Sequence, residues 1–256
     1  MQFTKSLLLL AALTTGSLAH RVHGHARRQS PAATSSAVPS SSGSSSGGSW
    51  TATPASGSYS TAGFGASTAN SGSDITYQGN VGNPWGSNII EVSESDASNY
   101  KYVAAISGQN TEAWTVVFWN KYGPDGKMDG WYGNAATKYV AFDDDTNGGF
   151  AAAPGSIPTD SGGGYASTWG EFDFGSNGNS GWSGFDVSAI VAQNAGLTVQ
   201  GMKMCDVFSG TCSTITPGAA SVDNAYTTAE TDIGGIGGNI SGDGPVRIAV
   251  TIDYSG

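Results

Sequence analysis

The sequence has 256 residues, a formal net charge of −10, three histidines and two cysteines. A chain this acidic is excluded from holding a nucleic-acid backbone or an anionic membrane surface, because both repel negative charge. It suits an acidic medium or neutral sugars, so we expect no nucleic-acid partner and no membrane partner.

The first residues predict export. Lys5 supplies a positive start, an apolar run fills 7–13, and the segment 17–19 ends in the small residue Ala19. This is the pattern of a signal peptide over 1–19, and its apolar run is too short to span a bilayer. We therefore expect a secreted protein, either extracellular or associated with the cell wall.

A second processing signal, the dibasic pair at 27–28, predicts a propeptide over 20–28. All three histidines precede this site, so cutting there leaves no imidazole for a catalytic triad or a zinc site. It also leaves six basic residues against twenty acidic ones, a formal charge of −14. Cutting only after Ala19 would instead make His20 the amino terminus, where it could bind copper together with His23. The dibasic signal favours the discarded propeptide.

Residues 29–58 contain no charged side chain and consist mostly of Ser, Ala, Thr, Gly and Pro. Such a segment cannot bury enough apolar surface to offset its chain entropy, so we expect a disordered, O-glycosylated linker. Trp50 is its one large aromatic residue, and we expect it to dock at the edge of the domain. The remainder, 59–256, has the length of one globular domain.

Strand patterns dominate 59–256. Residues 114–120 are apolar on both faces and predict a strand that is buried on each side. Residues 246–254 alternate, with Val246 on the apolar face and Arg247 on the polar one, which predicts a half-buried strand. Further strands are expected at 100–106, 138–142, 171–174 and 197–205. Many short strands joined by glycine-rich turns predict an all-β fold, a β-sandwich.

Two local signals refine this topology. A Pro-Asp-Gly sequence within 122–127 predicts a turn, and hence a hairpin in which 128–132 pairs with the strand before the turn. One short helix is expected within 186–196, with Asp186 or Ser188 as its N-cap.

Three carboxylates among aromatic residues form the first candidate site. In a strand, Glu171 and Asp173 share one face about 7 Å apart, while Phe172 and Phe174 point to the other face and into the core. That spacing is compatible with the paired carboxyls of a glycosidase, roughly 5–9.5 Å apart. It is also the pattern of any water-facing strand in an acidic protein. The third carboxylate, Asp186, fits a cleft or a helix cap. All three are catalytic candidates, and none is assigned a role.

Three aromatic residues, Trp131, Tyr132 and Trp182, lie among glycines in apparent loops. There they either stack on a sugar or fold under the loop as core residues. Together with Glu171 and Asp186, they are the candidate ligand-binding residues.

Three further motifs concern covalent and metal chemistry. Cys205 and Cys212 predict a disulfide in an exported chain. Asn239 begins a sequon for N-glycosylation, which predicts a glycoprotein. Residues 143–148 begin like a calcium loop, but Pro154 stands where the twelfth-position glutamate belongs. A solvated acidic loop is preferred there, and no metal or cofactor is predicted.

Seven blocks rich in Trp and Gly run in order through nearly all of 59–256. They are 80–93, 114–126, 130–135, 137–143, 169–174, 181–190 and 199–205. Together they resemble the secreted fungal allergen family of the Asp f four type. The resemblance implies an extracellular fungal protein that host IgE binds, and it supplies no catalytic mechanism.

A second resemblance concerns the fold. Residues 168–172 followed by 185–190, and later 222–232, are similar in order to blocks of thaumatin-like proteins. This resemblance implies an acidic cleft that holds β-1,3-glucan and includes Glu171 and Asp186. The chain departs from that family because it has two cysteines, whereas thaumatin-like proteins are disulfide-dense.

These observations lead to one functional expectation and one alternative. The expected function is that of a non-enzymatic secreted allergen, bound by IgE, with β-1,3-glucan of the cell wall as a ligand. The alternative is a weak glycoside hydrolase that uses two of Glu171, Asp173 and Asp186 in an acidic cleft.

Overall fold

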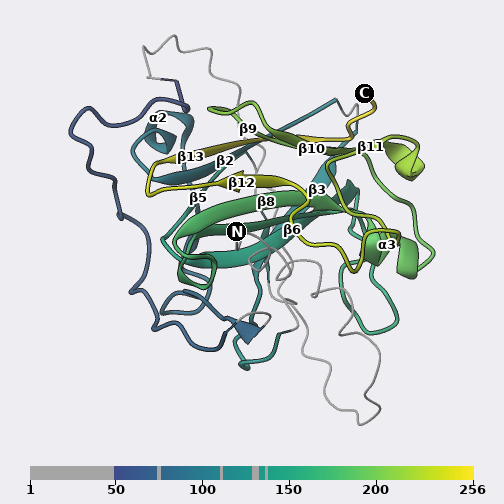
Figure 1. Ribbon diagram of the computed structural model, residues 1–256, viewed down its shortest axis with the longest axis horizontal. Helices are drawn as coiled ribbons and strands as arrows, with labels where there is room; N and C mark the ends of the chain where they lie inside the picture. Colours follow the sequence, from purple (N-terminus) through teal and green to yellow (C-terminus); the bar gives the residue numbers. More distant parts are fainter. Residues whose placement is uncertain (1–48, 74–75, 110–111, 129–132, 136–137) are drawn as a thin grey trace, which may run out of the picture.

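The computed structural model describes residues 49–256 except 74–75, 110–111, 129–132 and 136–137. Its strands form two sheets that lie one above the other, with short helices at the ends and edges (Figure 1). This arrangement confirms the predicted β-sandwich. Among the described residues, no helix has the length and apolarity needed to cross a bilayer.

One sheet has seven strands. In spatial order they are β1 (Ile89–Glu91), β5 (Tyr139–Phe142), β2 (Tyr102–Gly108), β13 (Val246–Ile252), β9 (Met202–Asp206), β10 (Cys212–Ile215) and β11 (Val222–Asp223). Strands β2 and β13 run parallel, and every other pair is antiparallel. The C-terminal strand β13 is therefore a central strand, which buries it more than an edge position would.

The other sheet has six strands, all paired antiparallel. In spatial order they are β12 (Gly238–Ile240), β8 (Trp182–Ser188), β7 (Trp169–Ser176), β6 (Thr146–Pro154), β3 (Trp114–Asn120) and β4 (Gly133–Ala135). The short helical elements are α2 (Glu94–Ala97), α3 (Ile190–Asn194), η3 (Asn177–Asn179) and η4 (Pro217–Ala219).

The core between the sheets is rich in phenylalanine. Phe142 from the seven-stranded sheet contacts Phe172 and Phe174 of β7, with ring centroids 4.8 and 4.6 Å apart. Phe118 stacks on Phe150 at 4.7 Å within the six-stranded sheet. The prediction that Phe172 and Phe174 are core residues is confirmed.

The outer face of the six-stranded sheet is also partly covered. Trp119 and Trp169 meet edge to face there, with centroids 5.1 Å apart, and Tyr165 from the loop before β7 stacks on Trp119. Strand β3 therefore has apolar neighbours on both sides, as its sequence predicts. A strand buried on both faces needs such a covering layer, because its backbone and side chains would otherwise expose a large apolar surface.

Arg247 is the main exception to the predicted pattern of β13. Its side chain is 0% exposed, so the prediction that it lies on the polar face of a half-buried strand and meets water is wrong. The reason is that Trp50 and its neighbours lie over this face, and the Trp50 carbonyl accepts a hydrogen bond from Arg247 Nε at 3.1 Å. The ring of Trp50 packs 6.2 Å from that of Tyr139, which confirms the docking expected for it.

One of the two local predictions needs correction. The predicted turn is present, since the Gly126 N–H donates to the Gly123 carbonyl. Strand β3 pairs with β4, and the predicted partner 128–132 lies outside the described residues except for residue 128. Helix α3 has Ala189 as its N-cap, without a side-chain cap. Asp186 and Ser188 belong instead to β8, because each pairs with a residue of β7 across the sheet.

Candidate functional site: a buried acidic cluster and a surface groove

The three candidate carboxylates lie together on the outer face of the six-stranded sheet. Glu171 is directly opposite Asp186, and Asp173 is directly opposite Gly184, on neighbouring strands β7 and β8. The shared face was predicted for Glu171 and Asp173, and the structure adds Asp186 to it. We refer to Glu171, Asp173 and Asp186 as the acidic cluster.

Exposure of the acidic cluster differs from the expectation. Glu171, Asp173 and Asp186 are 1%, 2% and 0% exposed, so the interpretation of a water-facing strand is wrong. Part of the reason is the chain that leads into β12. Gly237 lies against Asp186, and a Cβ built there would be 2.7 Å from Asp186 Cβ and 2.3 Å from the Phe185 carbonyl oxygen. With its φ of +104°, this position requires glycine.

Glu171 and Asp186 form a buried pair of carboxyls that lie directly opposite each other on β7 and β8. Burial raises the pKa of Glu171 well above its usual range, and the charge of Asp186 raises this pKa further. Burial also raises the pKa of Asp186, and the charge of Asp173 adds to that rise. Two ionised carboxylates side by side in a buried site repel each other, so both raised pKa values favour the presence of a proton on the pair.

Lys121 is the cation beside the acidic cluster, and sequence reasoning missed it. It directly follows β3 and is 2% exposed, and its Nζ makes no hydrogen bond within the described part of the chain. Burial lowers its pKa to about 8, although the charges of Asp173 and Glu171 oppose that shift. Only its place after a strand buried on both faces could have suggested burial, and most lysines in that position turn outward.

Asp173 is the member of the acidic cluster that accepts a side-chain hydrogen bond within the described residues, and the donor is Asn179. Its Oδ2 accepts a hydrogen bond from Asn179 Nδ2 at 3.2 Å. Burial raises its pKa to about 6, and hydrogen bonds from Asn179 and from the backbone of Gly184 oppose the rise. Several oxygens of the acidic cluster have no hydrogen-bond partner among the described residues. They are both carboxyl oxygens of Glu171, both of Asp186, and Oδ1 of Asp173.

This geometry differs from that of a glycosidase. Paired glycosidase carboxyls stand roughly 5–9.5 Å apart so that a sugar or a water fits between them. Glu171 and Asp186 instead lie directly opposite each other on neighbouring strands, and both are buried. The arrangement can hold a proton inside the sheet, which is a different task from cleaving an exposed polysaccharide.

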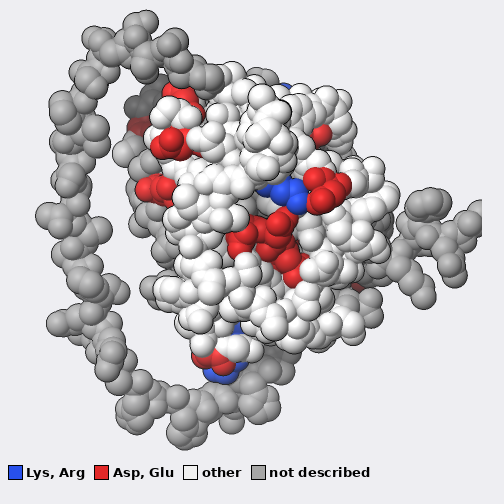
Figure 2. Space-filling model, turned by 90° about the vertical axis from the view of Figure 1, so that its left-hand side faces the viewer, with Lys and Arg blue, Asp and Glu red and all other residues white. Residues whose placement is uncertain are grey.

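A separate groove of about 490 Å³ opens at one end of the sandwich. Trp182 lines it, half-exposed at the start of β8, together with Lys101 and Asp144. Acidic side chains gather around a basic one on this face of the molecule (Figure 2). Trp182 lies four residues from Asp186, about 13 Å along the strand, so the structure separates the two candidates. The other aromatic candidates, Trp131 and Tyr132, lie outside the described residues.

The predicted acidic loop at 143–148 has a structural task. Asp145 accepts hydrogen bonds from Tyr77 Oη at 2.7 Å and from the Asn177 N–H at 2.9 Å. Asp143 accepts from Asn80 Nδ2 at 2.9 Å, and thereby fixes a second loop. Within the described residues, no three His, Cys, Asp or Glu side chains are grouped to hold a metal ion. The loop therefore ties neighbouring segments together.

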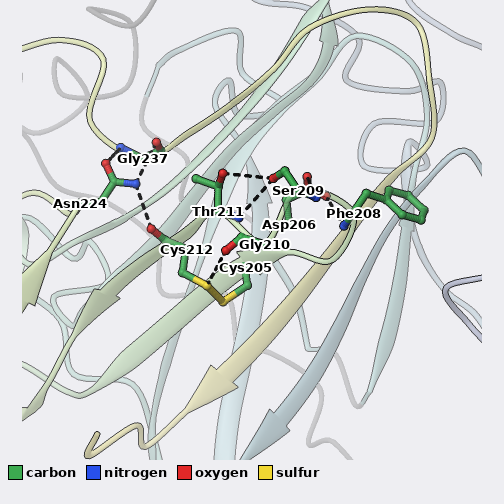
Figure 3. Close-up of a disulfide and its surroundings, with 9 residues drawn as sticks. All are labelled: Cys205, Asp206, Phe208, Ser209, Gly210, Thr211, Cys212, Asn224 and Gly237. Carbon is green, nitrogen blue, oxygen red and sulfur yellow. Dashed lines mark hydrogen bonds between the residues drawn. A yellow bond between two sulfur atoms is a disulfide. The ribbon is translucent and has the colours of Figure 1, made fainter.

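The predicted disulfide is present and closes the β9–β10 hairpin (Figure 3). Cys205 and Cys212 are directly paired across the two strands. Asn224 links this hairpin to the chain before β12, because its Nδ2 donates to the carbonyls of Cys212 and Gly237 at 2.9 and 3.0 Å. Phe208 points away from the disulfide at the hairpin tip and is 53% exposed.

Replacing both cysteines with serine should lower the free energy of unfolding by about 2–3 kcal/mol, because a short loop is then no longer closed in the unfolded chain. Urea unfolding of the oxidised wild type and the Cys205→Ser/Cys212→Ser variant measures this difference. A reducing agent should shift the wild type and leave the double variant unchanged. Equal midpoints for the two oxidised proteins would contradict the prediction.

The sequon asparagine Asn239 is exposed on the edge strand β12. Glycosylation there remains a prediction. Expression in a fungal host should yield a protein whose mass falls by one N-glycan when Asn239 is changed to Gln. The exposed Asn177, which begins no sequon, serves as the control position. The Asn177→Gln protein should still carry the mass of one N-glycan. Identical glycan masses for wild type and Asn239→Gln would show that the sequon is unused.

Comparison with known proteins identifies the family. The family profile described as "Allergen Asp f 4-like domain" matches residues 87–252. Allergen Asp f 4 of Aspergillus fumigatus is 54% identical over 215 residues, which are 80% of this chain and 66% of that relative. The chain thus spans just under two thirds of the relative's length.

Among solved structures, the protein elicitor MoHrip2 from Magnaporthe oryzae aligns with 60% of this chain and 99% of its own. Its TM-score of 0.36 at 10% identity is too low to support an argument about fold or function. None of these matches names a thaumatin-like protein, so that resemblance stays an expectation. The profile match, which covers more than half of the chain, shows that this protein belongs to the Allergen Asp f 4-like domain family.

Proposed function

We propose that this protein is a secreted, non-enzymatic allergen-like protein that human IgE binds. The observation that carries the proposal is its 54% identity, over 80% of the chain, to a protein named as an allergen. An antibody contacts about 800 Å² of folded surface, and two proteins this similar share many exposed positions within one fold. The short disulfide-closed hairpin adds a rigid exposed feature of the kind that antibodies bind without an ordering cost.

Competition for serum IgE tests the proposal. Sera with IgE against the Aspergillus fumigatus relative are mixed with this protein before they meet the immobilised relative. We expect the folded protein to remove a large part of the signal. Heat-unfolded protein should remove less, because antibody surfaces are assembled from separate chain segments. An unrelated acidic secreted protein serves as the control, and failure of the folded protein to compete at saturating concentration would overturn the proposal.

The non-enzymatic part rests on the acidic cluster. A glycoside hydrolase needs two accessible carboxyls, whereas Glu171, Asp173 and Asp186 are buried. We expect no release of reducing ends when the protein is incubated with β-1,3-glucan at pH 4 to 7. Hydrolysis by the wild type that disappears in a folded Glu171→Gln variant would restore the hydrolase alternative.

We also propose β-1,3-glucan as a ligand of the protein. A neutral polymer avoids the repulsion that a chain of net charge −10 exerts on acidic partners. The half-exposed Trp182 beside a groove supplies an aromatic surface of the kind that sugar rings stack on. Pull-down with insoluble β-1,3-glucan tests this. Retention of the wild type supports the proposal, and loss of the protein in the wash overturns it.

A further inference from the structure

We propose that the groove beside Trp182 is the site where this protein binds a neutral sugar chain, and that the acidic cluster is not part of that site. The inference rests on the glucan binding proposed above and assigns it to residues. Four separated segments converge on the groove: the start of β2, the loop before β6, the β7–β8 turn and the β12–β13 loop.

The size and walls of the groove fit a short oligosaccharide. Its volume of about 490 Å³ lies within the range of small-molecule sites, which is roughly 300–1,000 Å³. Gly181 and Gly242 line it, and a Cβ at either position would meet nothing within 4 Å. The backbone is therefore open to a ligand at both places, as happens where glycine allows close approach.

Trp182 supplies the aromatic surface. It stands at the first position of β8, opposite Ser176, beside an irregularity in the β7–β8 pairing. Bulges of this type re-aim side chains at the rim of a sheet. Trp182 is half-buried, whereas Ser183 after it and Ser176 opposite it are buried. Flat apolar faces with a polar edge suit sugar rings, which also have apolar C–H faces and polar rims.

Asp144 supplies the acceptor. Its side chain is 66% exposed, and its Oδ1 accepts hydrogen bonds from Lys101 Nζ at 3.0 Å and Tyr102 Oη at 2.8 Å. Its Oδ2 has no hydrogen bond within the described part of the chain. A carboxylate held on one oxygen is oriented in advance, so its other oxygen can accept from a sugar hydroxyl at low entropic cost.

The charge of the groove selects the class of ligand. Lys101 is already paired with Asp144 and Asp243, so it is not available to an anion. The remaining exposed charge is negative, which excludes acidic sugars and phosphate esters. Neutral sugars bind through hydroxyl groups and stacking, and their binding is insensitive to salt, whereas a basic peptide in the same groove would be displaced by salt.

The loops around the groove are fixed in place. Asp145 holds Asn177, which lines the groove, through the Asn177 backbone N–H at 2.9 Å and its side-chain amide at 3.1 Å. The same carboxylate bonds Tyr77 and Asn70. Loops that are hydrogen-bonded to one another in this way keep the geometry of the groove when no ligand is bound. Such preorganisation lets a small contact area bind a ligand.

Binding of a β-1,3-linked glucose hexamer, measured by calorimetry at 20 and 300 mM salt, tests the inference. The wild type is compared with Trp182→Ala and Asp144→Asn. Two matched controls lie outside the groove: Phe208→Ala removes another exposed aromatic ring, and Asp125→Asn removes another carboxylate paired with a lysine. Thermal unfolding of each variant shows that the protein tested is folded.

We expect Trp182→Ala to weaken binding about tenfold or more, because a central aromatic contact is lost. Asp144→Asn should weaken binding about fivefold, because a charged acceptor is replaced by a weaker neutral one. Both controls should bind like the wild type, and salt should change none of the affinities by more than about twofold. If Trp182→Ala does not fold, Asp144→Asn decides the question.

The possible failures are distinguishable. If the wild type binds the hexamer and both groove variants bind equally well, the assignment to the groove is overturned while glucan binding stands. If the wild type does not bind the hexamer or insoluble glucan, glucan binding itself is overturned. If hexalysine binds at 20 mM salt and the sugar does not, the groove is a site for basic peptides, and the inference is wrong.

Discussion

Replacing Glu171 with glutamine is expected to stabilise the fold at neutral pH and to flatten the dependence of stability on pH. The glutamine amide can donate a hydrogen bond to the Asp186 carboxylate that it faces across the strands. The cost of ionising a second carboxyl beside Asp186 disappears. The substitution therefore keeps the packing of β7 on β8 and removes one titrating group from the acidic cluster.

The direction of the pH effect follows from the raised pKa values. Glu171, Asp173 and Asp186 each have a pKa above that of an unfolded chain, so the folded protein holds protons that the unfolded chain releases. Stability is then fully present below about pH 4 and falls as pH rises through the folded pKa values. The fall begins near pH 4, and its Asp173 part extends from about pH 4 to about pH 6.

Lys121 acts in the opposite direction at higher pH. Its pKa is lowered to about 8, so between pH 8 and about 10.4 the folded protein has lost a proton that the unfolded chain retains. Stability rises with pH in that interval by the same linkage. The loss of stability caused by the acidic cluster is therefore clearest between pH 4.5 and 8.

Urea unfolding at steps from pH 4.5 to 8 measures these effects. Each proton that only the folded state retains makes the free energy of unfolding fall by about 1.4 kcal/mol per pH unit. The rise of the Asp173 pKa to about 6 therefore corresponds to a loss of about 3 kcal/mol in the free energy of unfolding. Glu171→Gln should have a shallower slope than the wild type, and the exposed Glu112→Gln should keep the wild-type slope. A wild type equally stable at pH 5 and pH 8 would contradict the burial of these acids.

Changing Arg247 to methionine is expected to cost about 2–3 kcal/mol of stability, the range for losing hydrogen bonds made by a charged group. Arg247 donates to the carbonyls of Lys101, Trp50 and Ala52 at 2.8, 3.1 and 3.1 Å. Methionine fills much of the volume but cannot donate to these carbonyls. The Lys101 carbonyl keeps its hydrogen bond from the Val246 N–H, whereas the bonds that hold the Trp50 and Ala52 carbonyls to β13 are lost. Burial lowers the pKa of Arg247 to about 10.

Chemical unfolding at pH 5 compares Arg247→Met with Lys203→Met. Lys203 lies on the neighbouring strand β9, and its Nζ stands 5.4 Å from the Tyr254 ring, so its loss should cost about 1 kcal/mol or less. We also expect Arg247→Met to make the bond after Trp50 more accessible to protease, because the anchor of that segment is lost. If the two variants are equally stable, Arg247 does not hold residues 50–52 against the sheet.

The sandwich could be predicted because strand alternation and glycine-rich turns are local signals. The pattern of 114–120 indicated a strand buried on both faces, and Phe172 and Phe174 could be assigned to the core from their spacing alone. The disulfide followed from two cysteines in an exported chain. The family was indicated by blocks rich in Trp and Gly, whose order the profile match over 87–252 confirms.

The candidate site could be predicted only in part. Alternation places Glu171 and Asp173 on one face, but it does not say what covers that face. Burial of the acidic cluster depends on contacts between distant segments, such as Gly237 against Asp186. Lys121 joins the cluster from a strand about fifty residues away. The partners of Arg247 are nearly two hundred residues away, at Trp50 and Ala52.

The sequence by itself determined the strands, the core phenylalanines, the disulfide and the family of this protein, because local periodicity and residue type specify them. Tertiary structure decided which polar residues meet water. It enclosed Glu171 with Asp186 and left Trp182 beside an open groove, although both positions lie on one sheet. The physical reason is that exposure depends on which segments pack over a face, and that packing is settled by the whole chain.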